Sequence, residues 1–234
     1  MNKDGYDDII VGSYGHDNGG TDEGQVYIYH GSASGLSATP DQTLSGTVGS
    51  AFFGYSVASA GDVNNDTYSD VIIGAYGEDK VYIYHGSASG FGAVAAQTLT
   101  GDQVGSQFGI SVSGAVDVNG DSYDDVVVGA DLYDNGNTDE GRVFAFHGGA
   151  SGIAAAVEWS MDINQDNAYL GHSVAGVGDV NKDGYGVVLI GAYGCENGHV
   201  EEGSHDGYVG LVAGLSYVAT GVLLSSSVGC VVCA

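Results

Sequence analysis

Two nine-residue segments of this chain, 62–70 and 117–125, carry oxygen-bearing side chains at positions 1, 3, 5 and 9. A third segment, 179–187, has them at positions 1, 3 and 5, and residues 2–8 hold part of the same pattern. Carboxylate and amide oxygens in one tight loop are the ligands that a hard cation such as Ca2+ requires, and the backbone carbonyl at position 7 adds another oxygen. The candidate ligands are Asn2, Asp4, Tyr6 and Asp8 in the first loop; Asp62, Asn64, Asp66, Tyr68 and Asp70 in the second; Asp117, Asn119, Asp121, Tyr123 and Asp125 in the third; and Asp179, Asn181, Asp183 and Tyr185 in the fourth.

Two other interpretations of the loops exist. An EF-hand needs Glu at position 12 and flanking helices, whereas Ile73 and Val128 stand there inside apolar runs. An Asx-rich turn without metal is the plainer alternative. Several carboxylates within nine residues repel one another unless a cation neutralises them, which favours calcium in the second and third loops. We expect weaker binding in the fourth loop, where Val187 replaces the ninth-position Asp, and in the first, which has no residue at position 1.

Other residues could carry chemistry but favour a structural role. His30, His85 and His147 recur at the end of one strand, and the acid pairs Asp22-Glu23 and Asp139-Glu140 also recur. An active site is normally built once, so we predict no catalytic residues and interpret the acid pairs as solvated loops. A zinc site at Cys195, His199 and His205 is a less favoured alternative.

The loops belong to a longer repeat. Position 5 falls at Asp4, Asp66, Asp121 and Asp183, which gives intervals of 62, 55 and 62 residues. The shorter interval lacks an acidic insertion that the other units carry at 17–24, 134–141 and 196–203. The insertion is therefore a surface loop on a constant framework.

Each unit has the texture of short β-strands. An apolar β-branched run follows each acidic loop, an alternating strand such as 26–30 comes next, and a Ser-Val pair begins the strand that leads to the next loop. Repeated units of about four strands and 40–60 residues are typical of propeller blades, which bury their faces against one another. We predict an all-β fold without helices, with blades at 1–52, 53–107, 108–169 and 170–234, the last losing its repeat after about residue 203.

The pattern resembles the FG-GAP repeat of integrin alpha N-terminal propellers, which also occurs in secreted bacterial proteins and in a phospholipase. The resemblance covers about residues 1–203 and rests on three signals in register: the acidic loop, an aromatic-Gly or Leu-Gly pair and a Gly-Ala pair. The two kinds of pair stand at Phe53-Gly54 with Gly74-Ala75, Phe108-Gly109 with Gly129-Ala130, and Leu170-Gly171 with Gly191-Ala192. Family propellers usually have seven blades. This chain supplies about three and a half, so we expect an open arc, the alternative being a four-bladed ring closed by the strand at 173–180.

Composition limits the partners. Four Lys and Arg against 30 Asp and Glu give a net charge of −26, which disfavours nucleic acid and anionic membranes. We expect no membrane span in the uncharged tail 208–234, because Gly and Ser interrupt it.

The resemblance implies a calcium-binding, non-enzymatic scaffold, extracellular or at the cell surface, for adhesion or recognition of an unidentified protein or glycan. The alternative is an accessory propeller of a secreted hydrolase or phospholipase, and open blade ends predict self-association.

Overall fold

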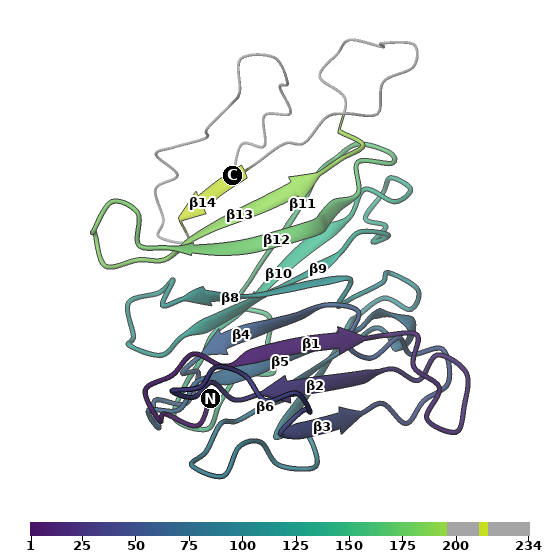
Figure 1. The fold of residues 1–234 in the computed structure, drawn as a ribbon. Coiled ribbons are helices and arrows are strands. Elements are labelled where there is room, and N and C mark those ends of the chain that lie inside the picture. The colour runs from purple at the N-terminus through teal and green to yellow at the C-terminus, as the bar shows by residue number, and fades with distance from the viewer. Residues whose placement is uncertain (196–210, 215–234) are drawn as a thin grey trace.

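A computed structural model describes residues 1–195 and, for its backbone, the strand at 211–214. Four antiparallel sheets follow one another along the chain (Figure 1). The first contains β1 (Ile9–Ser13), β2 (Gln25–Tyr29) and β3 (Gln42–Ser45). The second contains β4 (Val57–Gly61), β5 (Asp70–Ala75), β6 (Lys80–Tyr84) and β7 (Gln97–Thr100).

The other two sheets repeat this order. The third contains β8 (Ser111–Val116), β9 (Asp125–Ala130), β10 (Arg142–Phe146) and β11 (Trp159–Asp162). The fourth contains β12 (Leu170–Gly178), β13 (Val187–Ala192) and β14 (Leu211–Gly214). Among the described residues the only helical turn is the 3-10 turn η1 (Tyr76–Glu78).

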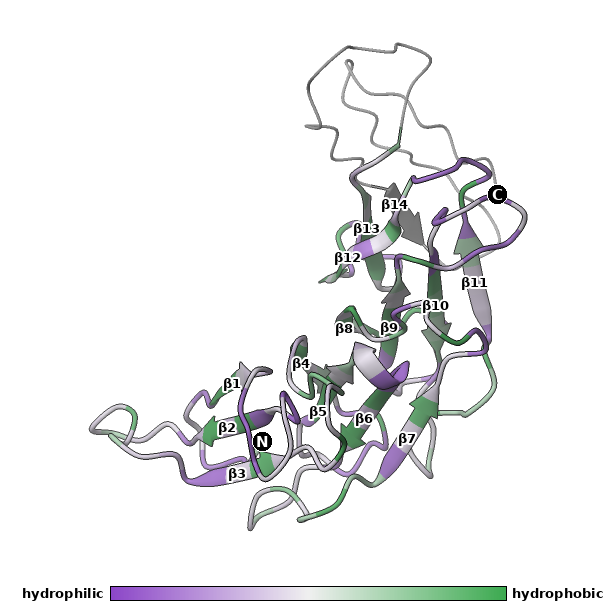
Figure 2. Ribbon diagram, turned by 90° about the vertical axis from the view of Figure 1, so that its right-hand side faces the viewer, coloured by the Kyte–Doolittle hydropathy of each residue, from purple (hydrophilic) through white to green (hydrophobic). Residues whose placement is uncertain are grey.

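The hydrophobic cores lie between neighbouring sheets, as in stacked propeller blades. Along β5, Val71 and Ile73 pack with the first sheet, while Ile72 between them packs with the third. All six residues of β5 and of β9 are buried, because a sheet lies on each face. Side chains of a strand alternate between faces, so an unbroken β-branched run fits a strand covered on both sides. In Figure 2 β9, one of these strands, is largely green, the colour of hydrophobic residues.

The paired motif residues mark the closest approach between sheets. A Cβ on Gly74 would lie 2.1 Å from the carbonyl oxygen of Gly109 in the next sheet, so only glycine allows the two backbones to meet. The hydroxyl of Ser56 donates to the same carbonyl at 2.8 Å. Equivalent contacts, with Gly129 and Ser111 meeting Gly171, join the third sheet to the fourth. The Gly-Ala pair, the aromatic-Gly pair and the Ser-Val pair therefore act together at one joint.

A second joint ties the outer strands of successive sheets. The side-chain amide of Gln97 donates to the carbonyl of Ile153 at 2.8 Å and its oxygen accepts from the amide of Ile153 at 2.7 Å. Gln42 makes the same pair of bonds to Phe91, at 2.6 and 2.9 Å. Trp159 stands at the corresponding place in the third sheet, so the described part of the chain holds this joint twice.

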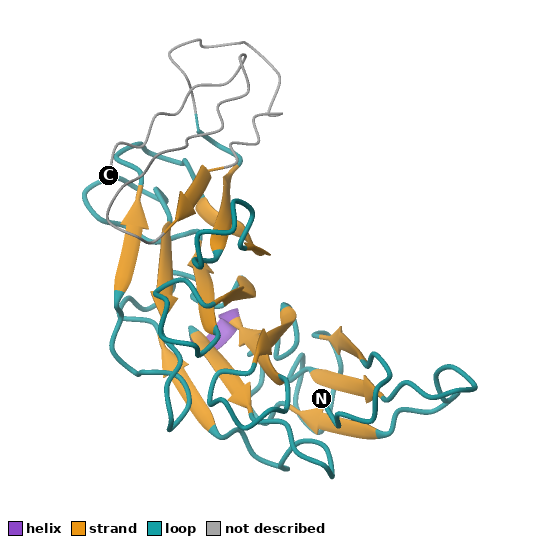
Figure 3. Ribbon diagram, turned by 90° about the vertical axis from the view of Figure 1, so that its left-hand side faces the viewer, coloured by secondary structure: helices purple, strands orange, loops and turns teal. Residues whose placement is uncertain are grey.

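The sheets form an open arc (Figures 2 and 3). β1 pairs with β2 and β12 pairs with β13, so the strand at 173–180 does not complete the first sheet. Ile9 and Val11 on the first sheet are each 44 % exposed. The expected all-β fold of partial propeller blades is confirmed, and the four-bladed ring is wrong.

Two further expectations met the structure only in part. The sheets fall within the ranges 1–52, 53–107, 108–169 and 170–234, whose exact boundaries stay a prediction. The loss of the repeat after residue 203 lies mainly outside the described residues. Within them, β14 pairs with β13 and supplies the third strand of the fourth sheet.

Candidate metal loops

The acidic loops all lie at the same edge of the arc. The second connects β4 to β5, the third connects β8 to β9, the fourth connects β12 to β13, and the first precedes β1. The second, third and fourth loops therefore each join the first strand of a sheet to its neighbour. Because strands in these sheets are antiparallel, the insertions at 17–24 and 134–141, which follow β1 and β9, lie at the opposite edge.

Inside the second loop the side chains at positions 1, 3 and 5 turn toward the same backbone. The amide of Asp66 donates to Asp62 Oδ1 at 2.9 Å and to Asn64 Oδ1 at 3.0 Å, and the amide of Tyr68 donates to Asp66 Oδ1 at 2.9 Å. Two oxygens that accept from one N–H must lie close together. Left-handed backbone at Asn65 and Thr67, with φ of 57° and 78°, produces this curl.

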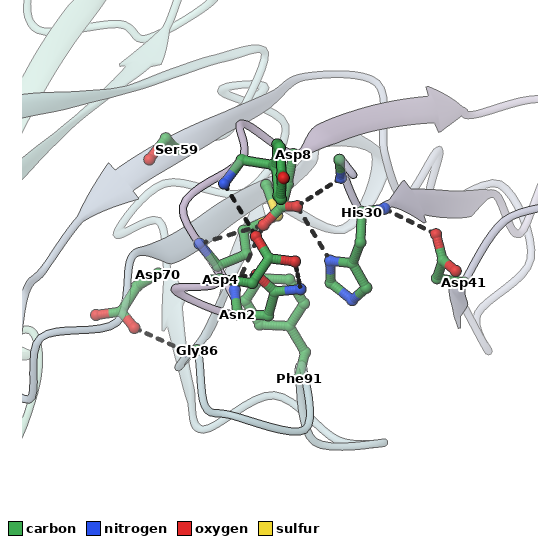
Figure 4. A network of polar contacts seen from close by, with 12 residues as sticks. Asn2, Asp4, Asp8, His30, Asp41, Ser59, Asp70, Gly86 and Phe91 are labelled. Carbon is green, nitrogen blue, oxygen red and sulfur yellow. Dashed lines mark hydrogen bonds and ion pairs between the residues drawn. The ribbon is translucent and has the colours of Figure 1, made fainter. Parts of the chain in front are cut away.

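The other loops repeat the arrangement. In the third, the amide of Asp121 donates to Asp117 and Asn119 at 3.1 and 2.8 Å. In the fourth, the amide of Asp183 donates to Asp179 and Asn181 at 3.1 and 3.2 Å. In the first, the amide of Asp4 donates to Asn2 at 3.1 Å and that of Tyr6 to Asp4 at 3.0 Å (Figure 4).

The ninth position behaves differently from the others. Asp70 and Asp125 are fully buried, although both belong to acidic loops. Asp125 accepts from the amide of Val118 at 2.7 Å and from that of Gly148 at 2.8 Å. Asp70 accepts in the same way from Val63 and Gly86. Burial raises the pKa of Asp70 and of Asp125 to about 6, against the lowering effect of those amides.

The recurring histidines stand beside these carboxylates, which the sequence did not reveal. His30 Nδ1 lies 3.3 Å from Asp8 Oδ1, as Figure 4 shows. His85 and His147 lie close enough to Asp70 and Asp125 to oppose part of the rise that burial causes in the pKa of these carboxyls. The signal was available in principle, since each histidine stands one residue before the glycine whose amide holds the ninth-position Asp.

The donor set of the loops suits a hard cation. Positions 1 and 3 offer carboxylate and amide oxygens that already converge on the amide of position 5, whose own carboxylate accepts from the amide of position 7. Positions 7 and 9 add further oxygens, which are the ligands that Ca2+ prefers. The oxygens point to the loop's own N–H groups, and within residues 1–195 no group of three or more His, Cys, Asp and Glu is arranged to hold a metal. To bind a cation, the exposed side chains would therefore have to rotate away from these amides.

Other candidates resolve as follows. Glu140 is only 1 % exposed and accepts from Asn137 at 3.0 Å, so the interpretation of the acid pair Asp139-Glu140 as solvated is wrong at Glu140. Cys195 is buried and disulfide-bonded, which removes the thiolate that a zinc site would need, and His199 and His205 lie outside the described residues. So does nearly all of the tail 208–234. In the described part of the chain, none of the helices has the length and apolar character to cross a membrane.

Comparisons with known proteins match the repeats. The model of the FG-GAP repeat matches residues 1–29, 53–96 and 108–146. Integrin alpha-6 of Gallus gallus is 40% identical over 134 residues, covering 56% of this chain and 12% of that protein. Integrin alpha-7 of Homo sapiens is 36% identical over 178 residues, covering 74% and 15%. The chain thus spans a small part of the length of these relatives.

Among solved structures, BBS1N in complex with ARL6DN superposes with a TM-score of 0.41 at 9% identity, covering 80% of this chain and 46% of that one. A similarity at this level supports no argument about function.

Proposed function

The chain belongs to the FG-GAP repeat family, and we propose that it is a calcium-stabilised, non-enzymatic propeller module that presents loops for recognition outside the cell. The observation that carries the proposal is the convergence of the oxygens at positions 1 and 3 on the amide of position 5, in loops at one edge of successive blades. A cation there would neutralise carboxylates that otherwise repel one another.

In the second and third loops five residues would hold the cation: the side chains at positions 1, 3, 5 and 9 and the carbonyl at position 7. These are Asp62, Asn64, Asp66, Tyr68 and Asp70, and Asp117, Asn119, Asp121, Tyr123 and Asp125. The bound ion supplies positive charge and fixes each loop to its two strands. The ninth-position carboxylate of the second loop accepts from the amides of Val63 and Gly86, which hold it at the start of β5.

The first and fourth loops are the weaker sites. The fourth has the apolar Val187, now the first residue of β13, where a carboxylate is required. In the first, Asn2, Asp4, Tyr6 and Asp8 offer a set without a position-1 carboxylate. Fewer negative ligands lower the affinity for Ca2+.

The recognition surface would be the opposite edge, where the insertions 17–24 and 134–141 lie. Both curl in the same way: Asp17 accepts from the amide of Asp22 at 2.8 Å and Asp134 from that of Asp139 at 2.7 Å. The similarity to integrin alpha chains, which are cell-surface adhesion proteins, supports an extracellular protein or glycan as the partner. The net charge of −26 favours a partner with a basic surface.

The test is thermal unfolding followed in calcium and in EDTA. Only the folded loop binds the ion, so calcium at a hundred times Kd should add about 2.7 kcal/mol per site. The variants D66A and D121A should lose most of the calcium-dependent part, while N137A, outside the loops, should keep it. A melting temperature that ignores EDTA would refute the proposal.

A further inference from the structure

The second and third metal loops are directly joined to each other. The amide of Asp62 donates to Asp124 Oδ2 at 2.7 Å, and the amide of Asp124 donates to the carbonyl of Asp62 at 3.3 Å. One residue further on, the amide of Gly149 donates to the carbonyl of Val63 at 2.9 Å. Asp62 is position 1 of the second loop and Asp124 is position 8 of the third, so a position that supplies no ligand clasps one that does.

The backbone of the second loop leaves room for this carboxylate. Gly61 has a φ of 77°, and a Cβ there would lie 2.1 Å from Asp124 Oδ2. Any larger residue at 61 would therefore displace the Asp124 side chain, besides adopting a left-handed backbone that favours glycine.

The junction between the third and fourth loops shows the reverse arrangement. Position 8 of the fourth loop is Gly186, which has no side chain to offer, and Val116, with a φ of 62°, stands where the second loop has Gly61. A Cβ on Gly186 would lie 2.4 Å from the carbonyl oxygen of Ala115. The amide of Gly186 donates to the carbonyl of Asp117 at 2.7 Å, and that is the only hydrogen bond between these two loops in residues 1–195. At this junction the earlier loop carries the side chain, at Val116, and the later loop carries the glycine, at Gly186.

We propose that Asp124 is a positioning residue that couples cation binding in the second and third loops. The proposal rests on the proposed function, since it assigns a property to the same loops. Asp124 is followed directly by Asp125, the ninth ligand of the third loop, and clasps both backbone groups of Asp62, the first ligand of the second. A cation bound in the third loop restricts Asp125 and therefore the peptide between Asp124 and Asp125. Because Asp124 is bonded to the backbone of Asp62, the backbone that carries the Asp62 carboxylate is restricted as well.

The consequence is positive cooperativity between these two loops alone. Ordering that one cation has already produced is no longer required of the next, and the coupling is reciprocal. The fourth loop lacks the side-chain clasp and binds independently of the third. If Asp124 were only an ordinary contact between blades, its replacement would lower stability, but binding in one loop would not depend on binding in the other.

Terbium luminescence excited through tyrosine can resolve the loops, because each carries one tyrosine at position 7 whose carbonyl survives a change to phenylalanine. In a Y185F background, which removes the ring that lies against Gly120 of the third loop, the signal lost in Y68F reports the second loop and that lost in Y123F the third. Competition with Ca2+ then gives an affinity for each loop.

We expect D124G to weaken Ca2+ binding in the second loop about tenfold, equivalent to about 1.4 kcal/mol. D124N keeps an oxygen that can accept from the Asp62 amide and should stay within about twofold of the wild type. D7G makes the same substitution at position 8 of the first loop and should leave the second loop unchanged. Equal affinities in D124G and the wild type would overturn the proposal, as would D124N behaving like D124G.

A cycle with D121N, which disables the third loop, tests the coupling itself. D121N should weaken the second loop several-fold in the wild-type background and have no effect in the D124G background. Equal effects in both backgrounds would make Asp124 merely structural. Should D124G fail to fold, the amide resonance of Asp62 in the wild-type chain and in D121N decides: it should shift when calcium fills the third loop, and an unmoved resonance overturns the coupling. No cation binding to any loop of the folded wild type would instead refute the proposed function.

Discussion

Replacing Asp125 by alanine should destabilise the protein even without calcium. The carboxylate is fully buried and accepts two backbone amides, those of Val118 and Gly148, at 2.7 and 2.8 Å. Each amide left unpaired in a buried place costs about 1–3 kcal/mol. The variant no longer buries a carboxylate, which offsets part of that cost. We therefore expect D125A to lose about 2–4 kcal/mol of unfolding free energy in EDTA.

The matched control is D121A in the same loop. Asp121 is exposed, and its bonds to Tyr123 and Asn119 lie at the surface, so its loss in EDTA should stay below about 1 kcal/mol. In saturating calcium both variants should lose the contribution of one bound ion. Urea unfolding in EDTA and in calcium, followed by circular dichroism, gives all the values. If D125A unfolds like the wild type in EDTA, the bonds from the two amides to the buried carboxylate do not stabilise the fold, and the reasoning fails.

Three further predictions follow from the joints, the buried acids and the open ends. Gly129→Ala would put a Cβ 1.9 Å from the carbonyl of Gly171, so it should unfold or severely destabilise the third and fourth blades, whereas Gly149→Ala, whose Cβ would meet only the carbonyl of Gly152 at 3.7 Å, should lower the melting temperature by a few degrees at most; similar melting of both would contradict the joint. Burial raises the pKa of Asp70 and Asp125 to about 6 in the folded protein, against about 3.9 in the unfolded chain, so the folded form takes up protons first and unfolding free energy in EDTA should rise as the pH falls from 7 to 5, by about 1 kcal/mol per group; a D70N/D125N variant with the same slope would exclude this origin. The exposed Ile9 and Val11 should cause concentration-dependent self-association in light scattering, which Ile9→Lys reduces; a monomer at all concentrations would rule it out.

The fold was predictable because its signals repeat. The β-branched runs before Gly74 and Gly129 gave the central strands, and their alternation between two neighbouring cores explains why no polar residue interrupts them. The role of the Gly-Ala and aromatic-Gly pairs as a joint between neighbouring sheets could not be predicted. The contact between Gly74 and the carbonyl of Gly109 joins residues far apart in sequence, and no local propensity encodes it.

The candidate loops were predictable as local structure but not in their environment. Spacing alone indicates that Asp62, Asn64 and Asp66 share a turn, because Asx side chains bond to nearby amides. The burial of Asp70 depends on the amide of Gly86, from the following strand connection. Burial of Glu140 under Asn137 and the place of β14 likewise depend on tertiary contacts that composition cannot show.

Calorimetric titration of the folded, calcium-free chain with Ca2+ tests the central claim most directly. The oxygen sets of the second and third loops predict two stronger sites, and the sets of the first and fourth predict weaker ones. The tight sites should disappear one at a time in D66A and D121A. Four equal sites, or no heat of binding beyond dilution, would contradict the account.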